Sequence, residues 1–142
     1  MNFSNTIVID RPVHDVFEYV ANLANVPQWN YAIVETRKLS EGPVGVGSRY
    51  FQLRSLPSPS EESLLVTEYE PDRRFAVEGD LGPLSGTLTY EFQETDGATR
   101  LTNSADLEAG GLARLAAPIT TGRIREAVAA NLEVLKSLLE SG

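Results

Sequence analysis

Two runs of alternating apolar and polar residues, joined by a tight-turn signal, constrain this chain more than any other feature. Leu88, Tyr90 and Phe92 alternate with polar residues in the first run, and a similar pattern covers 100–107. Asp96-Gly97 stands between the runs, and glycine readily takes the positive φ that a tight hairpin turn needs. The period of two predicts antiparallel strands with one dry face and one wet face. The dry face must be covered by another element.

The rest of the chain supplies further strands and the covering helices. Strands are predicted at 3–10, 31–39, 49–54, 63–70 and 74–79, in addition to the two alternating runs. The alternation assigns no buried face to 31–39 or 63–70. Apolar residues at spacings of three and four predict a first helix from Val13 to Ala24, with a short helical piece or turn at 28–30.

The C-terminal part, 112–140, has the composition of a helix, disturbed early by Pro118 and Gly122. Its apolar stripe consists of Ile124, Val128, Leu132, Leu135 and Leu139. From 118 to 140 it would extend roughly 35 Å at about 1.5 Å per residue, so it is the one element long enough to cover the sheet. The sequence therefore predicts a single α+β domain over 1–142, in the order strand, helices, five or six strands, long helix.

A sheet that curls around one helix leaves a cavity unless large side chains fill it. If Leu88 faces the long helix, the alternation turns Tyr90 and Phe92 inward too, and it places Tyr50, Gln52 and Arg54 outside. Tyr90 and Asn103 are the expected interior polar groups, and buried polar groups need partners. The predicted lining consists of Trp29, Tyr31, Phe51, Leu53, Phe75, Leu88, Tyr90, Leu101, Asn103, Leu115, Ile119 and Arg123.

Composition excludes several classes of function. The chain has 12 Lys and Arg against 20 Asp and Glu, a formal net charge of −8, which argues against nucleic-acid and anionic-membrane partners. It has no cysteine and one histidine, so no metal site or other cofactor is expected. The N-terminus lacks a basic region, and no apolar run approaches the roughly 20 residues of a transmembrane helix. A cytoplasmic location is therefore expected.

No residue pattern marks a catalytic site. His14 lies in the first turn of the first predicted helix and is interpreted as a surface residue. Glu61 and Glu62 lie beside a loop, and Glu78 alternates with apolar residues, so these acids are expected on solvated faces. Gly45-Val46-Gly47 lies between two strands and lacks the glycine spacing of a phosphate-binding loop.

The chain resembles the START-like helix-grip superfamily, also called SRPBCC, and within it the polyketide cyclase/dehydrase-type branch. The matching segments are Ile9–Phe17, Trp29, Val44–Ser48, Glu68–Arg74 and Gly97–Thr102. Their order and spacing span essentially the whole chain. The resemblance implies a cavity between the long C-terminal helix and the concave sheet face, used for lipids, polyketides or other apolar molecules. It carries over no catalytic residue.

The leading hypothesis is therefore binding of a small apolar or amphipathic molecule, with Tyr90, Asn103 and Arg123 orienting its polar end. The first alternative is a cyclase or dehydratase acting on a polyketide-like substrate in the same cavity. The second is a partner-binding module without a small ligand, for example a homodimer formed through a sheet edge or loops. Binding is favoured over acid–base catalysis because the predicted inward faces hold almost no titratable side chain; Glu35, Arg37 or Glu78 pointing inward would reverse that preference.

Overall fold

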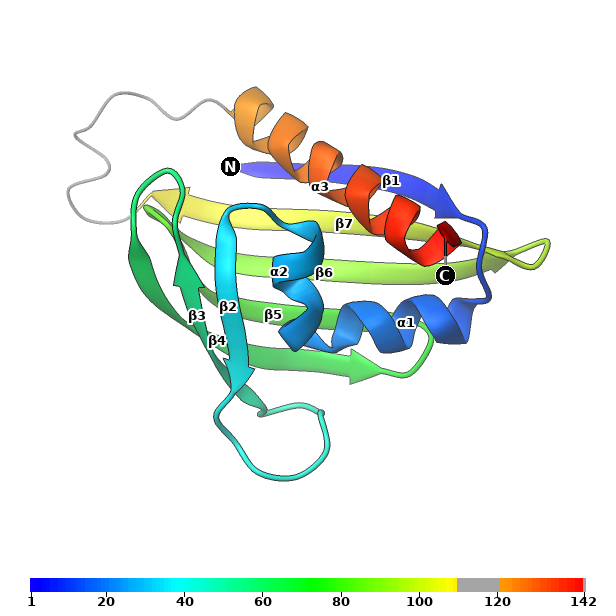
Figure 1. The fold of residues 1–142 in the computed structure, drawn as a ribbon, viewed down its shortest axis with the longest axis horizontal. Helices are drawn as coiled ribbons and strands as arrows, with labels where there is room; N and C mark the ends of the chain where they lie inside the picture. Colours follow the sequence, from blue (N-terminus) through cyan, green and yellow to red (C-terminus); the bar gives the residue numbers. More distant parts are fainter. Residues whose placement is uncertain (110–120, 142) are drawn as a thin grey trace.

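The fold is one curved antiparallel sheet with helices on one face, seen in a computed structural model that describes residues 1–109 and 121–141 (Figure 1). The strands are β1 (Asn2–Ile9), β2 (Ile33–Lys38), β3 (Arg49–Arg54), β4 (Ser60–Glu70), β5 (Arg74–Leu81), β6 (Leu84–Thr95) and β7 (Ala98–Ala109). The helices are α1 (Val13–Ala21), the short 3-10 helix η1 (Leu23–Asn25), α2 (Val26–Trp29) and α3 (Thr121–Ser141). This confirms the predicted α+β class and element order.

The seven strands lie in the order β1-β7-β6-β5-β4-β3-β2, and every neighbouring pair is antiparallel. Consecutive strands from β2 to β7 are joined as neighbours, and β1 closes the far edge by pairing with β7. The long β6–β7 hairpin turns at Asp96 and Gly97, which both take positive φ, as the turn signal predicts. Helices α1, α2 and α3 all lie over the same face of the sheet (Figure 1).

Two β-bulges explain why alternation could not assign a buried face to two of the strands. In β2 the register shifts between Ile33 and Glu35, so Ile33 and Thr36 are both buried although they are three residues apart. In β4 the shift falls between Val66 and Glu68, and Val66 and Tyr69 both contribute to the core. A bulge inserts one residue and reverses the parity beyond it, which breaks any period of two.

The predicted faces of β3 are wrong. Tyr50 and Gln52 are buried, whereas Phe51 and Leu53 are half-buried on the other face. Register places Tyr50 opposite Leu64 and Gln52 opposite Glu62, all on the helix-covered side. The Arg37 guanidinium covers the Phe51 ring, 4.8 Å from its centroid, a cation–π contact that suits an aromatic ring on the outer face.

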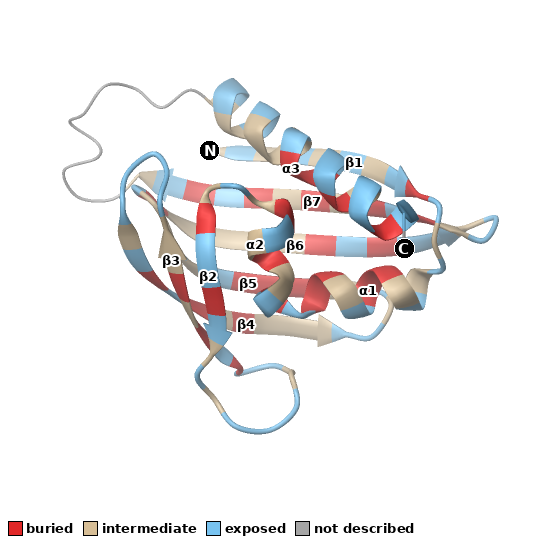
Figure 2. Cartoon of the chain, in the orientation of Figure 1, coloured by how far each residue is buried: buried red, intermediate tan, exposed pale blue. Residues whose placement is uncertain are grey.

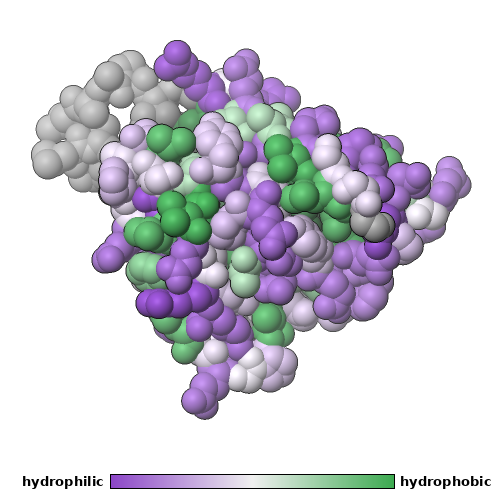
Figure 3. All heavy atoms as spheres, viewed as in Figure 1, coloured by the Kyte–Doolittle hydropathy of each residue, from purple (hydrophilic) through white to green (hydrophobic). Residues whose placement is uncertain are grey.

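The burial of side chains across the sheet follows the division into a helix-covered face and an outer face (Figure 2). Buried side chains alternate along β7 and lie in the first half of β5, while α3 has buried residues only in its second half. Figure 3 shows that hydrophilic residues cover most of the visible face, with hydrophobic ones in smaller separate patches. The negative charge expected from composition is therefore carried mainly by the surface, with one exception described below.

Candidate ligand-binding interior

The space between the helices and the concave sheet face holds two apolar clusters. The main cluster packs α1, η1, α2 and the second half of α3 against the sheet. The smaller cluster is Leu84, Ala105 and Leu107, with Ile124 of the first half of α3 packed against it. Ile124 and Val128 are only half-buried, whereas Leu132, Leu135 and Leu139 on the same stripe are buried. The first half of α3 is therefore less completely covered than the second.

Aromatic rings fill the interior beneath α1. Phe17 of α1 makes edge-to-face contacts with Phe92 and Tyr69, with ring centroids 5.1 and 5.3 Å apart. Phe75 lies between Tyr69 and Tyr90, 6.2 Å from each ring. Such contacts are typical of a packed core. Phe75 and Leu101 are thus in the interior, as predicted, and belong to its main apolar cluster.

Tyr90 and Asn103 lie where the two clusters meet, and Tyr90 itself belongs to the main cluster. They are direct register partners on β6 and β7, and both are buried. The next inward-facing pair on one side is Phe92 and Leu101, both of the main cluster. On the other side the next pair is Leu88 and Ala105, and Ala105 belongs to the smaller cluster, as does Leu107 beyond it. Asn103 Nδ2 donates to the Thr89 carbonyl at 3.4 Å. Burial raises the pKa of Tyr90, so its phenol stays neutral. The predicted interior position of this pair is confirmed.

Three other interior polar atoms differ from Asn103 because they have no hydrogen-bond partner within the described residues. They are Trp29 Nε1 on α2, Tyr50 Oη on β3 and Asn131 Oδ1 on α3. All three residues are more than nine-tenths buried. Trp29 belongs to the predicted lining, the predicted outward orientation of Tyr50 is wrong, and Asn131 is absent from the predicted lining. Asn131 stands three residues after Val128 on the α3 stripe, so helical spacing alone could have identified it.

One charged side chain, Glu62, is buried on the concave face, contrary to the prediction that it is solvated. Its side chain is 0% exposed and accepts hydrogen bonds from Gln52 Nε2 at 2.9 Å, Arg54 Nε at 2.9 Å and the Gly82 amide at 2.6 Å. Thr36 Oγ1 in turn donates to Gln52 Oε1 at 3.2 Å. This network joins β2, β3, β4 and the β5–β6 turn. The Glu62 carboxylate accepts three hydrogen bonds from this network, which indicates a structural role.

Other predicted lining residues lie elsewhere. Tyr31 is 66% exposed in the turn before β2, and Arg123 is exposed on α3, where its guanidinium keeps its hydration. Phe51 and Leu53 belong to the outer face. Leu88 faces inward and is half-buried. Leu115 and Ile119 lie outside the described residues. Glu35, Arg37 and Glu78, whose inward orientation would have favoured acid–base catalysis, are exposed.

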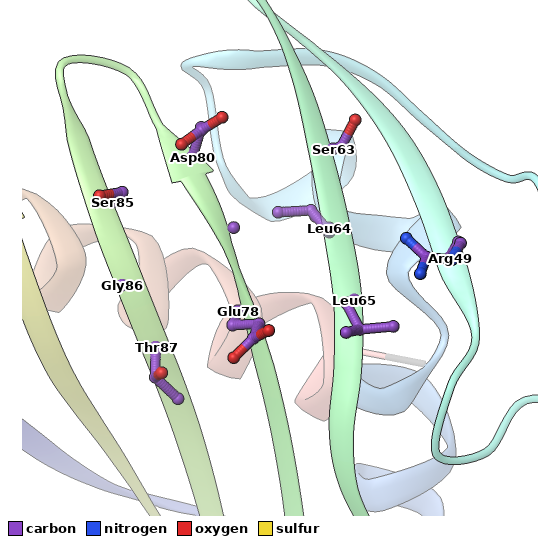
Figure 4. Close-up of a pocket in the computed structure, with 10 residues that line it drawn as sticks. Arg49, Ser63, Leu64, Leu65, Glu78, Asp80, Ser85, Gly86 and Thr87 are labelled. Carbon is purple, nitrogen blue, oxygen red and sulfur yellow. The ribbon is translucent and has the colours of Figure 1, made fainter.

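The outer face of the sheet carries two open depressions. The first, of about 390 Å³, is lined by Arg49, Ser63, Leu64, Leu65, Glu78, Gly79, Asp80, Ser85, Gly86 and Thr87, and Figure 4 views it with the helices behind the sheet. The second, of about 610 Å³, lies over β1, β6 and β7. Neither is lined by any of the three unpartnered buried atoms found in the described residues. The interior is therefore the better candidate site.

His14 joins the start of α1 to the β4–β5 turn. Its Nδ1 lies 3.0 Å from Asp72 Oδ1, and its Nε2 lies 3.6 Å from Oε1 of Glu18, one turn further along the helix. The hydrogen bond and charge of Asp72 raise the pKa of His14 above 6.5. The ring is mostly exposed, which agrees with the predicted surface position.

This pairing has a defined pH dependence. Because the folded pKa is raised, the pair stabilises the protein fully below pH 6.5, and the contribution is lost as pH rises through the folded pKa. NMR titration should give a His14 pKa above 6.5 in the wild type and a lower one in Asp72→Asn. The stability lost in His14→Gln should shrink above that pKa; an equal loss at every pH would contradict the assignment.

Within 1–109 and 121–141, no group of three His, Cys, Asp or Glu side chains could hold a metal ion. No helix in those ranges is both long and apolar enough to cross a bilayer.

Comparison with known proteins places the chain in a family. The model of a family described as polyketide cyclase/dehydrase and lipid transport matches residues 1–140. No curated protein matches the chain. Similar solved structures include a conserved protein from Geobacillus kaustophilus, with a TM-score of 0.79 and 14% identity over 99% of this chain and 96% of that one. A START superfamily protein from Mycobacterium smegmatis has a TM-score of 0.73 and 16% identity over 99% and 94%.

A third similar structure is the di-domain ARO/CYC StfQ from the steffimycin biosynthetic pathway, with a TM-score of 0.75 and 14% identity. The match covers 99% of this chain and 50% of that one. At such identities these structures show the fold alone. Because the family model matches nearly the full length, this chain belongs to the polyketide cyclase/dehydrase and lipid transport family and has the START-like helix-grip fold.

Proposed function

We propose that residues 1–142 form a single START-like domain that binds a small apolar or amphipathic molecule between α3 and the concave sheet face. The protein would act in the cytoplasm, without a metal or cofactor. The observation that carries this proposal is the buried Tyr90–Asn103 pair, set where the main apolar cluster, which includes Tyr90, meets the smaller one. The family description, which includes lipid transport, supports the same reading.

The two clusters and the polar pair would have separate roles. Apolar surface contributes affinity at roughly 25 cal/mol per Å² removed from water. The Tyr90 phenol and the Asn103 amide would orient the polar end of the ligand, because buried polar groups require hydrogen-bond partners. Arg123, which was expected to share this role, is exposed and is not included.

A polyketide cyclase-type enzyme using the same interior is the second candidate, favoured by the family description. General acid–base catalysis needs a group that can exchange a proton near neutral pH. Glu62 is the one charged side chain buried among the described residues, and three donors occupy it. Tyr90 has a raised pKa and can donate a hydrogen bond but is a poor base near neutral pH. The described interior therefore fits binding better than catalysis.

Native mass spectrometry of freshly purified protein tests the proposal. A reproducible apolar adduct is expected in the wild type. Asn103→Leu removes the amide and Tyr90→Trp fills space, so each should weaken the affinity for the ligand by roughly tenfold, or about 1.4 kcal/mol, and thereby lower the adduct occupancy. Tyr31→Trp makes a similar change at an exposed tyrosine and should leave the adduct unaltered.

Two outcomes would contradict the proposal. One is the absence of any adduct together with the absence of binding across a panel of lipids and polyketides. The other is an adduct that survives both interior substitutions in variants whose circular dichroism shows a native fold.

A further inference from the structure

The first of the two depressions on the outer face, which we call the outer depression, carries opposite charges on its two sides. Arg49 of β3 stands on one side, and Glu78 and Asp80 of β5 stand on the other, with Leu65 of β4 between Arg49 and Glu78 (Figure 4). Register places Arg49 opposite Leu65 and Leu65 opposite Glu78. The outer depression therefore presents a cation, an apolar side chain and an anion in one row across three strands.

The protein does not neutralise these charges. Arg49, Glu78 and Asp80 are exposed, and none of them forms an ion pair with another described residue. By contrast, Arg74 at the start of β5 has two acidic partners. Neighbouring strands lie about 4.8 Å apart, so the backbones of Arg49 and Glu78 are separated by roughly 10 Å. This separation leaves room for a small molecule that carries one charge of each sign.

Two glycines and two hydroxyl groups complete the lining. Gly79 and Gly86 are register partners on β5 and β6. A Cβ at Gly79 would lie 2.3 Å from a backbone oxygen of β4, and a Cβ at Gly86 would lie 2.0 Å from one of β7, so neither position accepts a side chain. Ser85 and Thr87 flank Gly86, and their hydroxyls can accept hydrogen bonds from an ammonium group. The volume of about 390 Å³ is therefore built on bare backbone between polar groups.

We propose that the outer depression binds a free α-amino acid with an apolar side chain, at a site separate from the interior. The ligand's carboxylate contacts the Arg49 guanidinium, which can form two parallel hydrogen bonds with it. The ammonium group contacts Glu78 and Asp80, and the apolar side chain packs on Leu65. One carbon atom joins the two charged groups of an α-amino acid, so a single compact molecule serves both sides of the depression.

Three probes with one side chain separate the two charges. L-Leucine carries both charges, L-leucinamide lacks the carboxylate, and N-acetyl-L-leucine lacks the ammonium group. Binding is followed by NMR titration of the backbone amides of Asp80, Ser85 and Thr87, at a pH where leucinamide is protonated. Leucine should bind about fivefold more tightly than either analogue, which is the upper end of what one exposed ion pair contributes. High salt should reduce this difference because it screens exposed charges.

Substitutions on the two sides then assign each charge. Arg49→Gln should weaken leucine binding about fivefold without weakening leucinamide binding, because leucinamide has no carboxylate to lose a partner. The double variant Glu78→Gln/Asp80→Asn should weaken leucine binding without weakening N-acetylleucine binding, for the corresponding reason. Arg123→Gln and Glu126→Gln make the same charge changes at exposed positions of α3 and should leave all three affinities unaltered.

The inference is wrong if leucine binds no more tightly than both analogues, or if the Arg49 variant binds leucine as the wild type does. It is also wrong if leucine shifts the Trp29 indole N–H and leaves Asp80 unchanged, because the amino acid then lies in the interior. The absence of any shift up to the solubility limit of leucine would overturn the outer site while leaving the proposed interior ligand standing.

Discussion

Replacing Gly86 with alanine is expected to destabilise the protein by roughly 4 kcal/mol, a large part of the 5–15 kcal/mol typical of a domain. Gly86 has a φ of +151°, and a Cβ there would lie 2.0 Å from the Asp106 carbonyl oxygen of β7. Its partner Gly79 is equally crowded, with a Cβ 2.3 Å from the Ser63 oxygen. Close strand approach and unusual backbone conformation would both oppose the side chain.

Urea unfolding measures this effect as a fall in the midpoint concentration. Gly45→Ala is the matched control because a Cβ at Gly45 meets nothing within 4 Å and its φ is not in the left-handed region. It should change stability by less than about 0.5 kcal/mol. A Gly86→Ala midpoint equal to that of the control would show that the strands can move apart at little cost.

Glu62→Leu is expected to cost about 3–5 kcal/mol, because it leaves the Arg54 guanidinium unpaired in a largely buried position. It also removes the acceptor of Gln52 Nε2 and of the Gly82 amide, so the β5–β6 turn loses its tie to β4. Thermal unfolding followed by circular dichroism gives the measurement. Glu61→Leu, on the same strand but exposed, should be close to neutral.

The double variant Arg54→Met/Glu62→Leu tests whether the stability effects of the two charges are coupled. Removing both charges avoids an unpaired ion, so the double variant should be more stable than Glu62→Leu alone. If the two substitutions instead add, the pair does not couple, and the account of Glu62 as a buried anchor is contradicted.

Most of the fold could be predicted because the governing patterns are local. The alternation along β6 and β7 and the helical stripe of α3 each reflect one face packed on apolar neighbours. The bulges in β2 and β4 could not be predicted, because each is set by pairing with a neighbouring strand. The hydrogen bond between Gln52 of β3 and Glu62 of β4 makes both side chains acceptable inside, which reverses a prediction for β3 based on hydrophobic residues alone.

The residues of the candidate site were also predictable only in part. Tyr90 and Asn103 were predictable because β6 and β7 keep their period throughout. Tyr50 was misplaced with the rest of β3, and Arg123, expected inside, is exposed on α3. Glu62 could not be identified, since its burial depends on partners from β3 and from the β5–β6 turn.

An NMR titration with 6-hydroxy-2-acetonaphthone, a small aromatic hydroxyketone, shows whether a ligand binds on the concave side of the sheet. Binding there should shift the Trp29 indole N–H and the side-chain amides of Asn103 and Asn131, all interior groups. Shifts confined to Asp80, Ser85 and Thr87 would place the ligand in the outer depression and rule out binding in the interior.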